Sequence, residues 1–507
     1  MKSDSKNISH WSIFIKICCL FVSCITYSDS DKSSTLGDMS PNFIIIYIDD
    51  MGFSDFGPFS DKTIKTPNLD KLASEGQIWT NFYSAASVCS PSRAALLTGK
   101  LPISTGLYGD KIGVFFPSSK RGISHELQTL PELLKAAGYN TGLFGKWHLG
   151  DNKKYYPTEH GFNEWVGIPY SNDMDWQVNS ITSSNIFLPW EDSGDKWSIV
   201  SKVLRARIFD PKVADWQVPL LSSYKKTNGD TKTVIVEKPI NQHLSVKTFT
   251  EHSIRFIQKS SNDKSKFFMI LAHSMPHVPL FTSDNFSNKS EKGIYGDVIE
   301  EIDWSVGQVI SALDSLNLSE NTYLIFTSDN GPWLTYESHA GNSDPLRGGK
   351  GTSFEGGMRA LTLFSGPDVY NGEVSGLGVQ TDLFNTILDL AKLETRKDLK
   401  NSFNLAATIK KNDASPRDFV PFYVGSELRA FRLRDHKIHF VTQGAFGAPP
   451  KRKIHSPPVL INLIKNQEED FRKNIENDEL LESLLQRVNE FNNSIIRKSS
   501  IFDVQYE

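Results

Sequence analysis

Four apolar runs, each followed at once by polar residues, dominate the hydrophobic pattern of the chain. The first, Asn42–Ile48, is rich in β-branched residues and ends in Asp49 and Asp50. A continuous apolar run of this length predicts a strand that is buried on both faces of a parallel sheet. Three later runs have the same form: 140–144, 267–272 and 322–327.

Helices with one apolar face are predicted between these runs. The predicted helix 295–316 carries its apolar residues on one stripe, and the predicted helix 131–137 begins with a capping box of Thr129 and Glu132. Further helices are predicted at 66–76, 246–258 and 381–390, and further strands at 78–82 and 360–364. Alternation of buried strands with amphipathic helices predicts an α/β fold.

Polar side chains follow all four of the buried strands. They are Asp49 and Asp50, Lys146 and His148, His273 and His277, and Asp329 and Asn330. The carboxyl ends of parallel strands share one edge of a sheet, and ligands of open α/β sheets bind there. These side chains are therefore expected to converge on one site.

The last part of the chain has a different pattern. Charged residues up to about Asp418 predict a linker, and short strands are predicted at 420–424, 428–433 and 437–442, followed by a polar helix from 468 to 498. This pattern predicts a smaller C-terminal α+β domain over 396–507, after a catalytic domain over 41–395.

The N-terminus resembles an export signal. Lys2 and Lys6 precede an apolar segment, 11–27, and residues 28–40 are small and polar. The pattern predicts a secretory signal peptide and leader over 1–40, with a membrane-anchored helix as the alternative. Phe21-Val22-Ser23-Cys24 also resembles a lipobox, in which case a lipid on Cys24 would be the one contact with a membrane.

The cysteine content and the net charge indicate which cellular locations and which classes of partner are expected. Three of the four cysteines lie in the export segment, so Cys89 is alone in the folded body and no disulfide is expected there. An exported chain without disulfides favours a periplasmic, secreted or lipid-anchored bacterial protein over a secretory or lysosomal one. The net charge of −4 over 507 residues excludes a general affinity for polyanions, so nucleic acid is not an expected partner.

The segment Cys89–Lys100 predicts a short helix with a thiol in its first turn. Ser90 is the expected N-cap, Pro91 the first helical residue, and Gly99 the terminating residue. A helix N-terminus favours anions, and Arg93 lies over the same face. Cys89 can be a small buried hydrophobe, a catalytic thiolate or a residue that is modified. Thiolate phosphatases need an arginine where Ala95 stands, which makes the second interpretation unfavourable.

The polar residues at the strand ends suggest metal-assisted chemistry on an oxyanion. Asp49, Asp50, Asp329 and the amide oxygen of Asn330 form an oxygen-rich set that suits Ca²⁺ or Mg²⁺, although an isolated Asp-Asp pair is more often a solvated turn. Cationic or proton-donating groups accompany them: Arg93, Lys146, His148, His277 and Lys350. Sulfate and phosphate esters both fit such a site. The glycine-rich stretch 347–359 lacks the spacing of a nucleotide-binding loop.

Five ordered motifs resemble those of type I sulfatases, most closely of the arylsulfatase A kind. They are Asp49-Asp50-Met51-Gly52, Cys89-Ser90-Pro91-Ser92-Arg93 continuing through Gly99, Gly145-Lys146-Trp147-His148-Leu149-Gly150, Ser328-Asp329-Asn330-Gly331, and Gly349-Lys350-Gly351-Thr352 with Glu355-Gly356-Gly357. The resemblance implies an alkaline-phosphatase-like α/β/α sandwich and a smaller C-terminal domain made of an antiparallel sheet and a helix.

The resemblance also implies a mechanism. A formylglycine-generating enzyme would oxidise Cys89 to formylglycine, and a divalent cation, Ca²⁺ in preference to Mg²⁺, would be held by Asp49, Asp50, residue 89, Asp329 and Asn330. The hydrated aldehyde would attack sulfur while His277 or Lys350 protonates the leaving alcohol. His148 would then take a proton so that sulfate leaves, and Arg93 and Lys146 would neutralise charge.

A sulfated polysaccharide or oligosaccharide is the expected substrate. The segment from 173 to about 239 reads as irregular binding loops with Trp176, Trp190, Trp197 and Trp216, which could stack on sugar rings or pack beneath the loops. A phosphate or phosphonate monoester hydrolase of the same superfamily is one alternative. The other is a non-catalytic binder of sulfated glycans, in which Cys89 would remain a thiol.

Overall fold

The structure is a computed structural model that describes residues 40–507 apart from 61, 187–192 and 227. The predicted signal peptide, with Cys24 and the lipobox, lies outside the described residues, as does Trp190. None of the helices in the described part combines the length and apolar character needed to cross a membrane.

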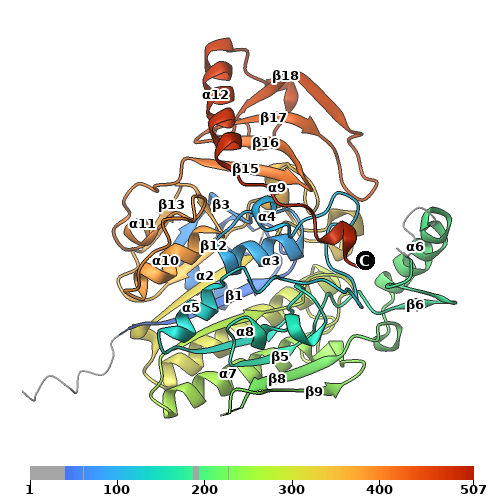
Figure 1. Ribbon diagram of the computed structural model, residues 1–507, viewed down its shortest axis with the longest axis vertical. Coiled ribbons are helices and arrows are strands. Elements are labelled where there is room, and N and C mark those ends of the chain that lie inside the picture. Colours follow the sequence, from blue (N-terminus) through green and yellow to red (C-terminus); the bar gives the residue numbers. More distant parts are fainter. Residues whose placement is uncertain (1–39, 61, 187–192, 227) are drawn as a thin grey trace, which may run out of the picture. The chain divides into compact units, whose positions relative to one another are not determined.

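A ten-stranded mixed sheet forms the centre of the body spanning 41–507 (Figure 1). The four predicted buried strands are neighbours in it and run parallel to one another. From one edge to the other the order is β13 (Gly372–Val374), β2 (Gln77–Trp79), β12 (Thr362–Ser365), β11 (Thr322–Ser328), β1 (Asn42–Ile48), β10 (Phe267–Ala272), β4 (Asn140–Gly145), β5 (Glu164–Gly167), β8 (Leu220–Lys225) and β9 (Thr231–Glu237). The register places Ile45 of β1 between Ile270 and Ile325.

Helices cover both faces of this sheet, which explains why its central strands are apolar along their whole length. One set of alternate β1 residues, including Ile44 and Ile46, packs in a core with α2 (Pro67–Glu75), α7 (Ser245–Asn262) and α8 (Gly293–Ser315). The other set, including Phe43 and Ile45, packs with α3 (Cys89–Thr98), α5 (Leu130–Ala136) and α10 (Asp382–Leu390). The predicted α/β/α sandwich is confirmed.

Several predictions near the sheet edges are wrong. The predicted strand 78–82 is two strands, and the second, β3 (Phe82–Tyr83), pairs with β14 (Gly378–Val379) outside the large sheet. The segment 173–239 is not irregular throughout, because it contains β6 (Gln177–Val178), β7 (Ile181–Thr182), α6 (Ser193–Phe209), β8 and β9. The predicted strand 360–364 is present as β12, with its bounds shifted to Thr362–Ser365, and it is antiparallel to β11.

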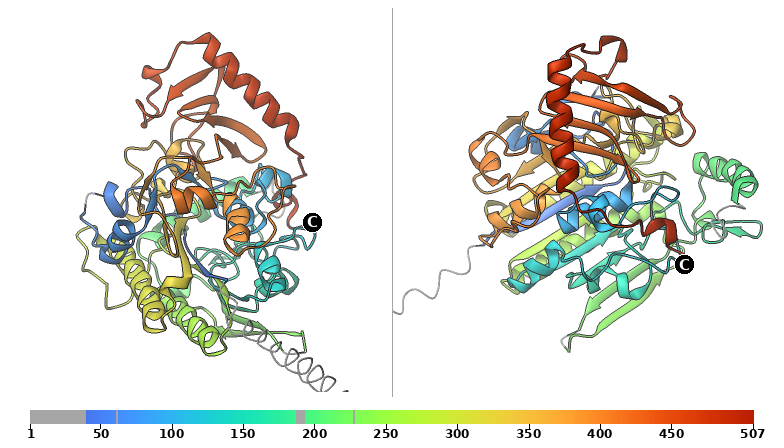
Figure 2. Two further views of the ribbon diagram at one scale, coloured as in Figure 1. Left: turned by 90° about the vertical axis from the view of Figure 1, so that its left-hand side faces the viewer. Right: turned by 45° about the horizontal axis from the view of Figure 1, so that its top comes forward.

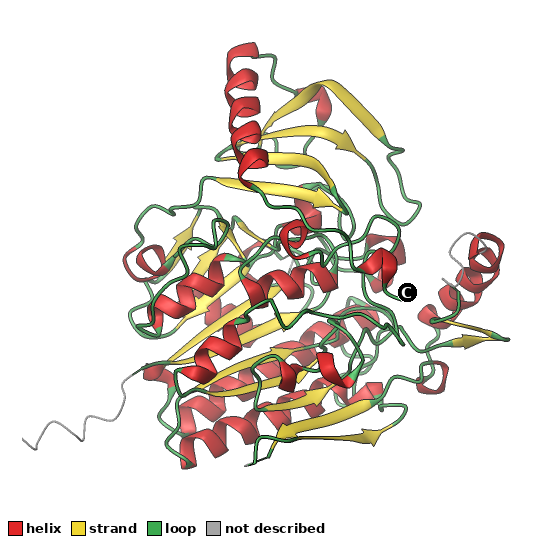
Figure 3. Ribbon diagram, viewed as in Figure 1, coloured by secondary structure: helices red, strands yellow, loops and turns green. Residues whose placement is uncertain are grey.

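The C-terminal region forms a separate antiparallel sheet, as predicted, and this sheet has four strands instead of three. Its strands are β15 (Phe419–Val424), β16 (Glu427–Leu433), β17 (His436–Thr442) and β18 (Lys453–Asn462). Helix α12 (Asp478–Ser494) lies along one face of this sheet (Figures 2 and 3), where Leu484 and Phe491 pack with Phe431. The helix is shorter than predicted, and β18 was not predicted as a strand.

The predicted linker before this sheet is packed rather than free. It contains α11 (Ala406–Lys411), whose Ile409 is fully buried, and Arg417 forms a buried ion pair of 2.6 Å with Asp382 of α10. The charged residues of this segment misled the prediction, because one of them, Arg417, forms its ion pair in the protein interior. Two further helices are short, α4 (Pro102–Thr105) and α9 (Glu355–Met358). The segment Leu334–His339 is a six-residue 3₁₀ helix.

Candidate active site

All the predicted site residues lie at one edge of the large sheet. Loops after β1, β4, β10 and β11 supply the polar residues, α3 supplies Cys89 and Arg93, and the loop before α9 supplies Lys350. Every one of these side chains is buried: Asp49, Asp50, Cys89, Arg93, Lys146, His148, His277, Asp329, Asn330 and Lys350. The expected convergence of the strand ends is therefore observed, except for His273, whose Nε2 lies 3.0 Å from Oγ of Ser305 on α8.

Helix α3 begins two residues earlier than predicted. Its N-cap is Val88, so Cys89 is the first helical residue and Pro91 stands at the third. Proline is tolerated there because the first N–H groups of a helix have no partner within it. Ser90 is not the cap, and its Oγ accepts a hydrogen bond of 3.3 Å from the backbone N–H of Phe115. Gly99 ends the helix in the left-handed conformation, as predicted.

The side chain of Cys89 points into a cluster of carboxylates. Its Sγ lies 3.4 Å from Oδ1 of Asp49. Burial, together with the charge of Asp49, raises the pKa of this thiol well above its ordinary value. A thiol held in its neutral form is a poor nucleophile, which argues against the catalytic-thiolate interpretation. The unmodified Sγ stands where an oxygen would lie if residue 89 were oxidised and hydrated.

The acidic cluster, Asp49, Asp50 and Asp329, fits a hard divalent cation. One ligand atom from each of these residues and from Cys89 can be chosen so that all lie within 4.8 Å of one another. Asn330 donates from Nδ2 to Oδ1 of Asp50 over 2.6 Å, and its own Oδ1 is buried without a hydrogen-bond partner among the described residues. Carboxylate oxygens beside a buried amide oxygen that lacks a donor are the ligand set that Ca²⁺ prefers.

Each carboxylate of the acidic cluster is also paired with a basic side chain. Lys146 donates to Oδ2 of Asp49, and Lys350 donates to Oδ2 of Asp50 over 2.8 Å. Arg93 contacts Oδ2 of Asp329 through two nitrogens, at 3.0 and 2.9 Å. The cluster is thus arranged as three carboxylates faced by three cations.

The pKa values of the three carboxyl groups diverge because they share one buried space. Burial would raise the pKa of Asp49, but Lys146, with further cations, holds it well below its usual range. Burial raises the pKa of Asp50 despite the opposing charge of Lys350. Burial and the charge of Asp49 raise the pKa of Asp329 to about 7. A bound divalent cation would supply the positive charge needed to keep all three ionised.

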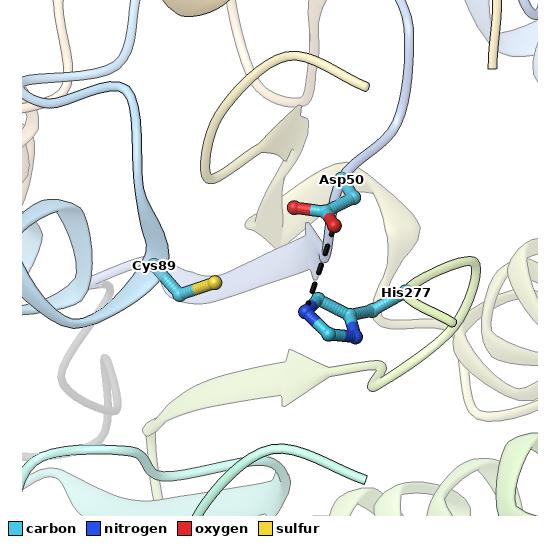
Figure 4. Close-up of side chains that lie close together, drawn as sticks. All are labelled: Asp50, Cys89 and His277. Atoms are coloured by element: carbon cyan, nitrogen blue, oxygen red, sulfur yellow. Dashed lines mark ion pairs between the residues drawn. The ribbon is translucent and has the colours of Figure 1, made fainter. Parts of the chain in front are cut away.

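The two histidines are poised differently around this cluster. Nε2 of His148 lies 2.9 Å from the carbonyl oxygen of Phe115, so it carries the proton, and Nδ1 has no partner among the described residues. Nδ1 of His277 contacts the carbonyl of Val278 at 2.6 Å, and its Nε2 lies 3.6 Å from Oδ2 of Asp50 (Figure 4). Burial, with nearby cations, lowers the pKa of both rings well below the ordinary value. Nδ1 of His148 therefore presents a free lone pair to the site, whereas Nε2 of His277 also lies 3.4 Å from Oγ of Ser171.

Two site residues have strained backbones. Asp50 and His148 adopt the left-handed region, with φ of 66° and 63°. Residues other than glycine rarely do so, and such strain concentrates at functional sites.

Comparison with known proteins identifies the family. The model of the sulfatase family matches residues 41–393, and the model for the C-terminal region of aryl-sulfatase matches 415–506. This chain belongs to the sulfatase family. The resemblance to arylsulfatase A-like enzymes and the predicted fold class are confirmed, and the chain is an enzyme of the sulfuric ester hydrolase class.

Named sulfatases resemble the chain over most of its length. N-acetylgalactosamine-6-sulfatase of Homo sapiens is 36% identical over 414 residues, covering 79% of this chain and 72% of the relative. Arylsulfatase A of Homo sapiens is 33% identical over 449 residues, covering 85% and 83%. The crystal structure of PsFucS1 sulfatase from Pseudoalteromonas sp. has a TM-score of 0.73 and 25% identity, covering 91% of this chain and 92% of that one.

Three residues of this sulfatase site escaped the sequence prediction. Ser171 accepts a hydrogen bond of 3.0 Å from Lys146, and Asp173 lines the same space with an Oδ1 that lacks a partner among the described residues. Both follow β5, a four-residue strand too short to recognise. The indole of Trp333 covers the ammonium of Lys350, 4.3 Å from the ring centroid. The sequence signal that could have identified Trp333 is its position three residues after Asn330.

A cavity of about 490 Å³ opens above Cys89 in this sulfatase. Cys89, His148, His277 and Lys350 lie at its base, and Trp333 and other aromatic residues form its walls. Trp176 and Trp216 also border it, although each is almost fully buried, so they pack beneath the loops instead of standing free. The side chain of Trp197, like Trp190, lies outside the described part.

Proposed function

We propose that this sulfatase hydrolyses sulfate monoesters of a carbohydrate, with Cys89 matured to formylglycine by a formylglycine-generating enzyme. The observation that carries the proposal is the position of Cys89. Its side chain lies at the first residue of α3 and among the acidic cluster, at the base of a cavity large enough for a sugar. Two alternatives are a phosphate or phosphonate monoester hydrolase and a non-catalytic glycan binder. The first predicts faster hydrolysis of a phosphate ester than of the matching sulfate ester, and the second predicts that Cys89 remains a thiol.

A divalent cation, Ca²⁺ in preference to Mg²⁺, would be held by Asp49, Asp50, Asp329, Asn330 and residue 89. Mg²⁺ usually retains several waters, whereas Ca²⁺ accepts a site built almost entirely from protein oxygens. The cation would stabilise negative charge on the sulfate oxygens and on the attacking oxygen. The unpartnered Oδ1 of Asn330 supports this assignment.

The side chains around residue 89 would prepare the attack and the release of sulfate. The hydrated aldehyde supplies two hydroxyl groups, one for attack on sulfur and one whose deprotonation permits sulfate to leave. Asp329, whose carboxylate lies beside residue 89, is suited to accept a proton from it. The free Nδ1 of His148 is suited to take the second proton. Arg93 and Lys146 would neutralise charge and hold residue 89 in place.

Lys350 and His277 would act on the leaving alcohol. Both border the cavity, and Lys350 is the one protonated group of the pair, because Asp50 raises its pKa against the opposing effect of burial. Lys350 would give a proton to the departing alkoxide, either directly or through Nε2 of His277. Their roles stay a proposal, as do those of the other site residues.

A sulfated oligosaccharide or polysaccharide is the proposed substrate. One relative is an N-acetylgalactosamine-6-sulfatase, and the cavity is bordered by several aromatic side chains, which stack on sugar rings. We also propose export directed by 1–40, to the periplasm, the cell surface or the medium, with lipidation at Cys24 as one route. We further propose that residues 41–395 form the catalytic unit and residues 396–507 the C-terminal unit.

Turnover of matched substrates tests the proposal. The chain is purified from cells that co-express a formylglycine-generating enzyme and is assayed with 4-nitrophenyl sulfate, 4-nitrophenyl phosphate and a panel of sulfated oligosaccharides. Sulfate ester hydrolysis that exceeds phosphate ester hydrolysis, and that disappears in Cys89→Ala, is expected. Faster phosphate hydrolysis would favour the phosphate or phosphonate hydrolase, and no turnover of any ester would favour the binder.

A further inference from the structure

A second cavity adjoins the one above Cys89. It has a volume of about 300 Å³, and Trp333, Lys350 and Phe446 border both cavities. The rings of Trp333 and Phe446 pack against each other with their centroids 4.7 Å apart. This aromatic pair is therefore the wall between the two spaces.

Phe446 forms the exposed top of this wall. It lies on the loop 443–452 between β17 and β18 of the C-terminal sheet, and 52% of its surface is exposed. The loop is held in shape by its own backbone hydrogen bonds, from Gly444 to Pro450 and from Ala448 to Ala445. An exposed aromatic ring on an ordered loop beside a catalytic cavity is suited to stack on a sugar.

Gly351 allows this loop to approach the catalytic residues. A Cβ at position 351 would lie 2.7 Å from the Cβ of Ala445 and 3.0 Å from the ring of Phe446, and the residue has a φ of +80°. Glycine is the residue that meets both demands. The neighbour of Lys350 in sequence thus brings Phe446 to the edge of the site.

Arg347 supplies an anion-binding group in the second cavity. Its guanidinium lies over the rings of Phe354 and Phe471, at 4.4 and 4.8 Å from their centroids, and Nη1 donates to the backbone carbonyl of Glu469 over 2.9 Å. It forms no ion pair with a carboxylate of the described residues, and none of the residues that line this cavity is acidic. The remaining N–H groups are therefore fixed in place and available.

We propose that the substrate is an oligosaccharide with a second anionic group, which extends from the catalytic cavity across Phe446 and places that group, a carboxylate or sulfate of the neighbouring sugar, on Arg347. The inference rests on the proposed function and extends it to a specificity-determining residue. Lys350 borders this cavity too, but its ammonium is engaged with Asp50, so Arg347 is the cation that remains for the second anion.

Binding of three matched tetrasaccharides tests the inference. Each begins with N-acetylgalactosamine 6-sulfate linked to glucuronate: the native compound, the compound with its carboxylates reduced to alcohols, and the reduced compound with sulfate on the new hydroxyls. Titration calorimetry in Ca²⁺ buffer uses the full chain carrying Cys89→Ala, which prevents turnover. The native compound is expected to bind about tenfold more tightly than the reduced one, the contribution of a charge-assisted pair.

Variants of Arg347 then show whether this residue causes the difference in affinity between the native and the reduced compound. Arg347→Gln is expected to remove the discrimination, and Arg347→Lys, which keeps the charge but not the planar fork, to retain part of it. Arg472→Gln is the matched control, since this arginine is 90% exposed and borders neither cavity. The third compound decides whether sulfate can replace carboxylate. Equal binding of native and reduced compounds, no binding of either, or discrimination that survives Arg347→Gln would overturn the inference.

A separate assay distinguishes failure of the inference from failure of the proposed function. The compound 4-methylumbelliferyl sulfate has no second anionic group that could bind Arg347. Its turnover by the wild-type chain therefore reports on sulfate hydrolysis alone. Turnover without charge-dependent binding rejects the second subsite. Charge-dependent binding without turnover supports the subsite and rejects the proposed reaction. Melting temperatures of the Arg347 variants show that each is folded when titrated.

Discussion

The ammonium of Lys350 donates a hydrogen bond of 2.8 Å to Oδ2 of Asp50, which lies 300 positions earlier in the chain. Nε2 of His277 lies 3.6 Å from the same oxygen, and the indole of Trp333 covers the ammonium. Asp50 thus positions both groups that face the cavity while it also belongs to the acidic cluster. One carboxylate therefore couples the cation site to the groups that would act on the leaving alcohol.

Replacement of His277 or Lys350 should affect substrates according to their leaving groups. A sugar alkoxide needs a proton or a positive charge as it leaves, whereas 4-nitrophenolate needs neither. We expect His277→Asn and Lys350→Gln to lower kcat on a sugar sulfate by about 10²- to 10⁴-fold, as for loss of a general acid, and on 4-nitrophenyl sulfate by much less. Equal losses on both substrates, measured as kcat, would contradict these roles.

Removal of the cation should destabilise the protein and stop turnover. The acidic cluster contains three buried carboxylates that repel one another without an ion. Dialysis against EDTA should lower the melting temperature, and Ca²⁺ at about 100 times its Kd should restore about 3 kcal/mol of stability together with activity.

Single carboxylate variants test whether that ion lies in the acidic cluster. Asp329→Asn should require at least tenfold more Ca²⁺ for recovery. Asp398→Asn, at an exposed carboxylate paired with Arg396, should behave as wild type. A melting temperature and a turnover rate that do not respond to EDTA would show that no ion is used.

The contact between α9 and the C-terminal sheet should be sensitive to acid. Oε1 of Glu355 lies 3.0 Å from Nζ of Lys437 on β17, and Arg359 and Arg432 each approach Oε2 to 3.5 Å. Burial alone would raise the pKa of Glu355, but Lys437 and the two arginines lower it from 4.5 to about 2. The ionised carboxylate therefore stabilises the fold fully above pH 4.5, and this contribution is lost as the pH falls toward 2.

Glu355→Gln provides the measurement. The variant leaves Lys437 without one of its two buried partners and should cost about 3–5 kcal/mol at neutral pH. The difference in melting temperature between wild type and variant should be constant above pH 4.5 and should shrink below it. A difference that stays constant as the pH falls further would mean that Glu355 is not the group responsible.

Crowding at Gly351 should change recognition of long substrates. Gly351→Ala would push Ala445 and Phe446 away from the wall between the two cavities, so KM for a sulfated oligosaccharide should rise several-fold. Gly447→Ala is the matched control, because Gly447 also has a left-handed φ, +81°, but a Cβ there meets no atom of the described residues. Equal changes in KM for both variants would attribute the effect to backbone strain instead of to the position of Phe446.

The sequence predicted the parts of the site that follow long buried strands. β1, β4, β10 and β11 are covered on both faces, so their apolar runs are continuous and their polar ends are easy to recognise. Asp49, Lys146 and Asp329 stand directly at or beside these ends. The pairing of Asp50 with Lys350 could not be predicted in this way, because Lys350 follows no strand and reaches the site on a loop.

Elements with short or mixed patterns were missed for identifiable reasons. β5 has four residues, and the loop after it carries Ser171 and Asp173. Among the described side chains of α6, Val200, Leu204 and Ile208 form the buried stripe, while Ile199 and Phe209 are exposed and blur the pattern. Phe446 comes from a loop of the C-terminal sheet, and its place beside Trp333 depends on packing between distant parts of the chain.

The chemical state of residue 89 is the measurement that tests the central claim most directly. Trypsin releases residue 89 in the peptide 72–93, which contains no other cysteine. In protein from cells with a formylglycine-generating enzyme, mass spectrometry should find this peptide lighter by about 18 Da than the unmodified form, since an aldehyde replaces the thiol. A peptide found entirely with the cysteine mass, in protein that still hydrolyses sulfate esters, would contradict the account.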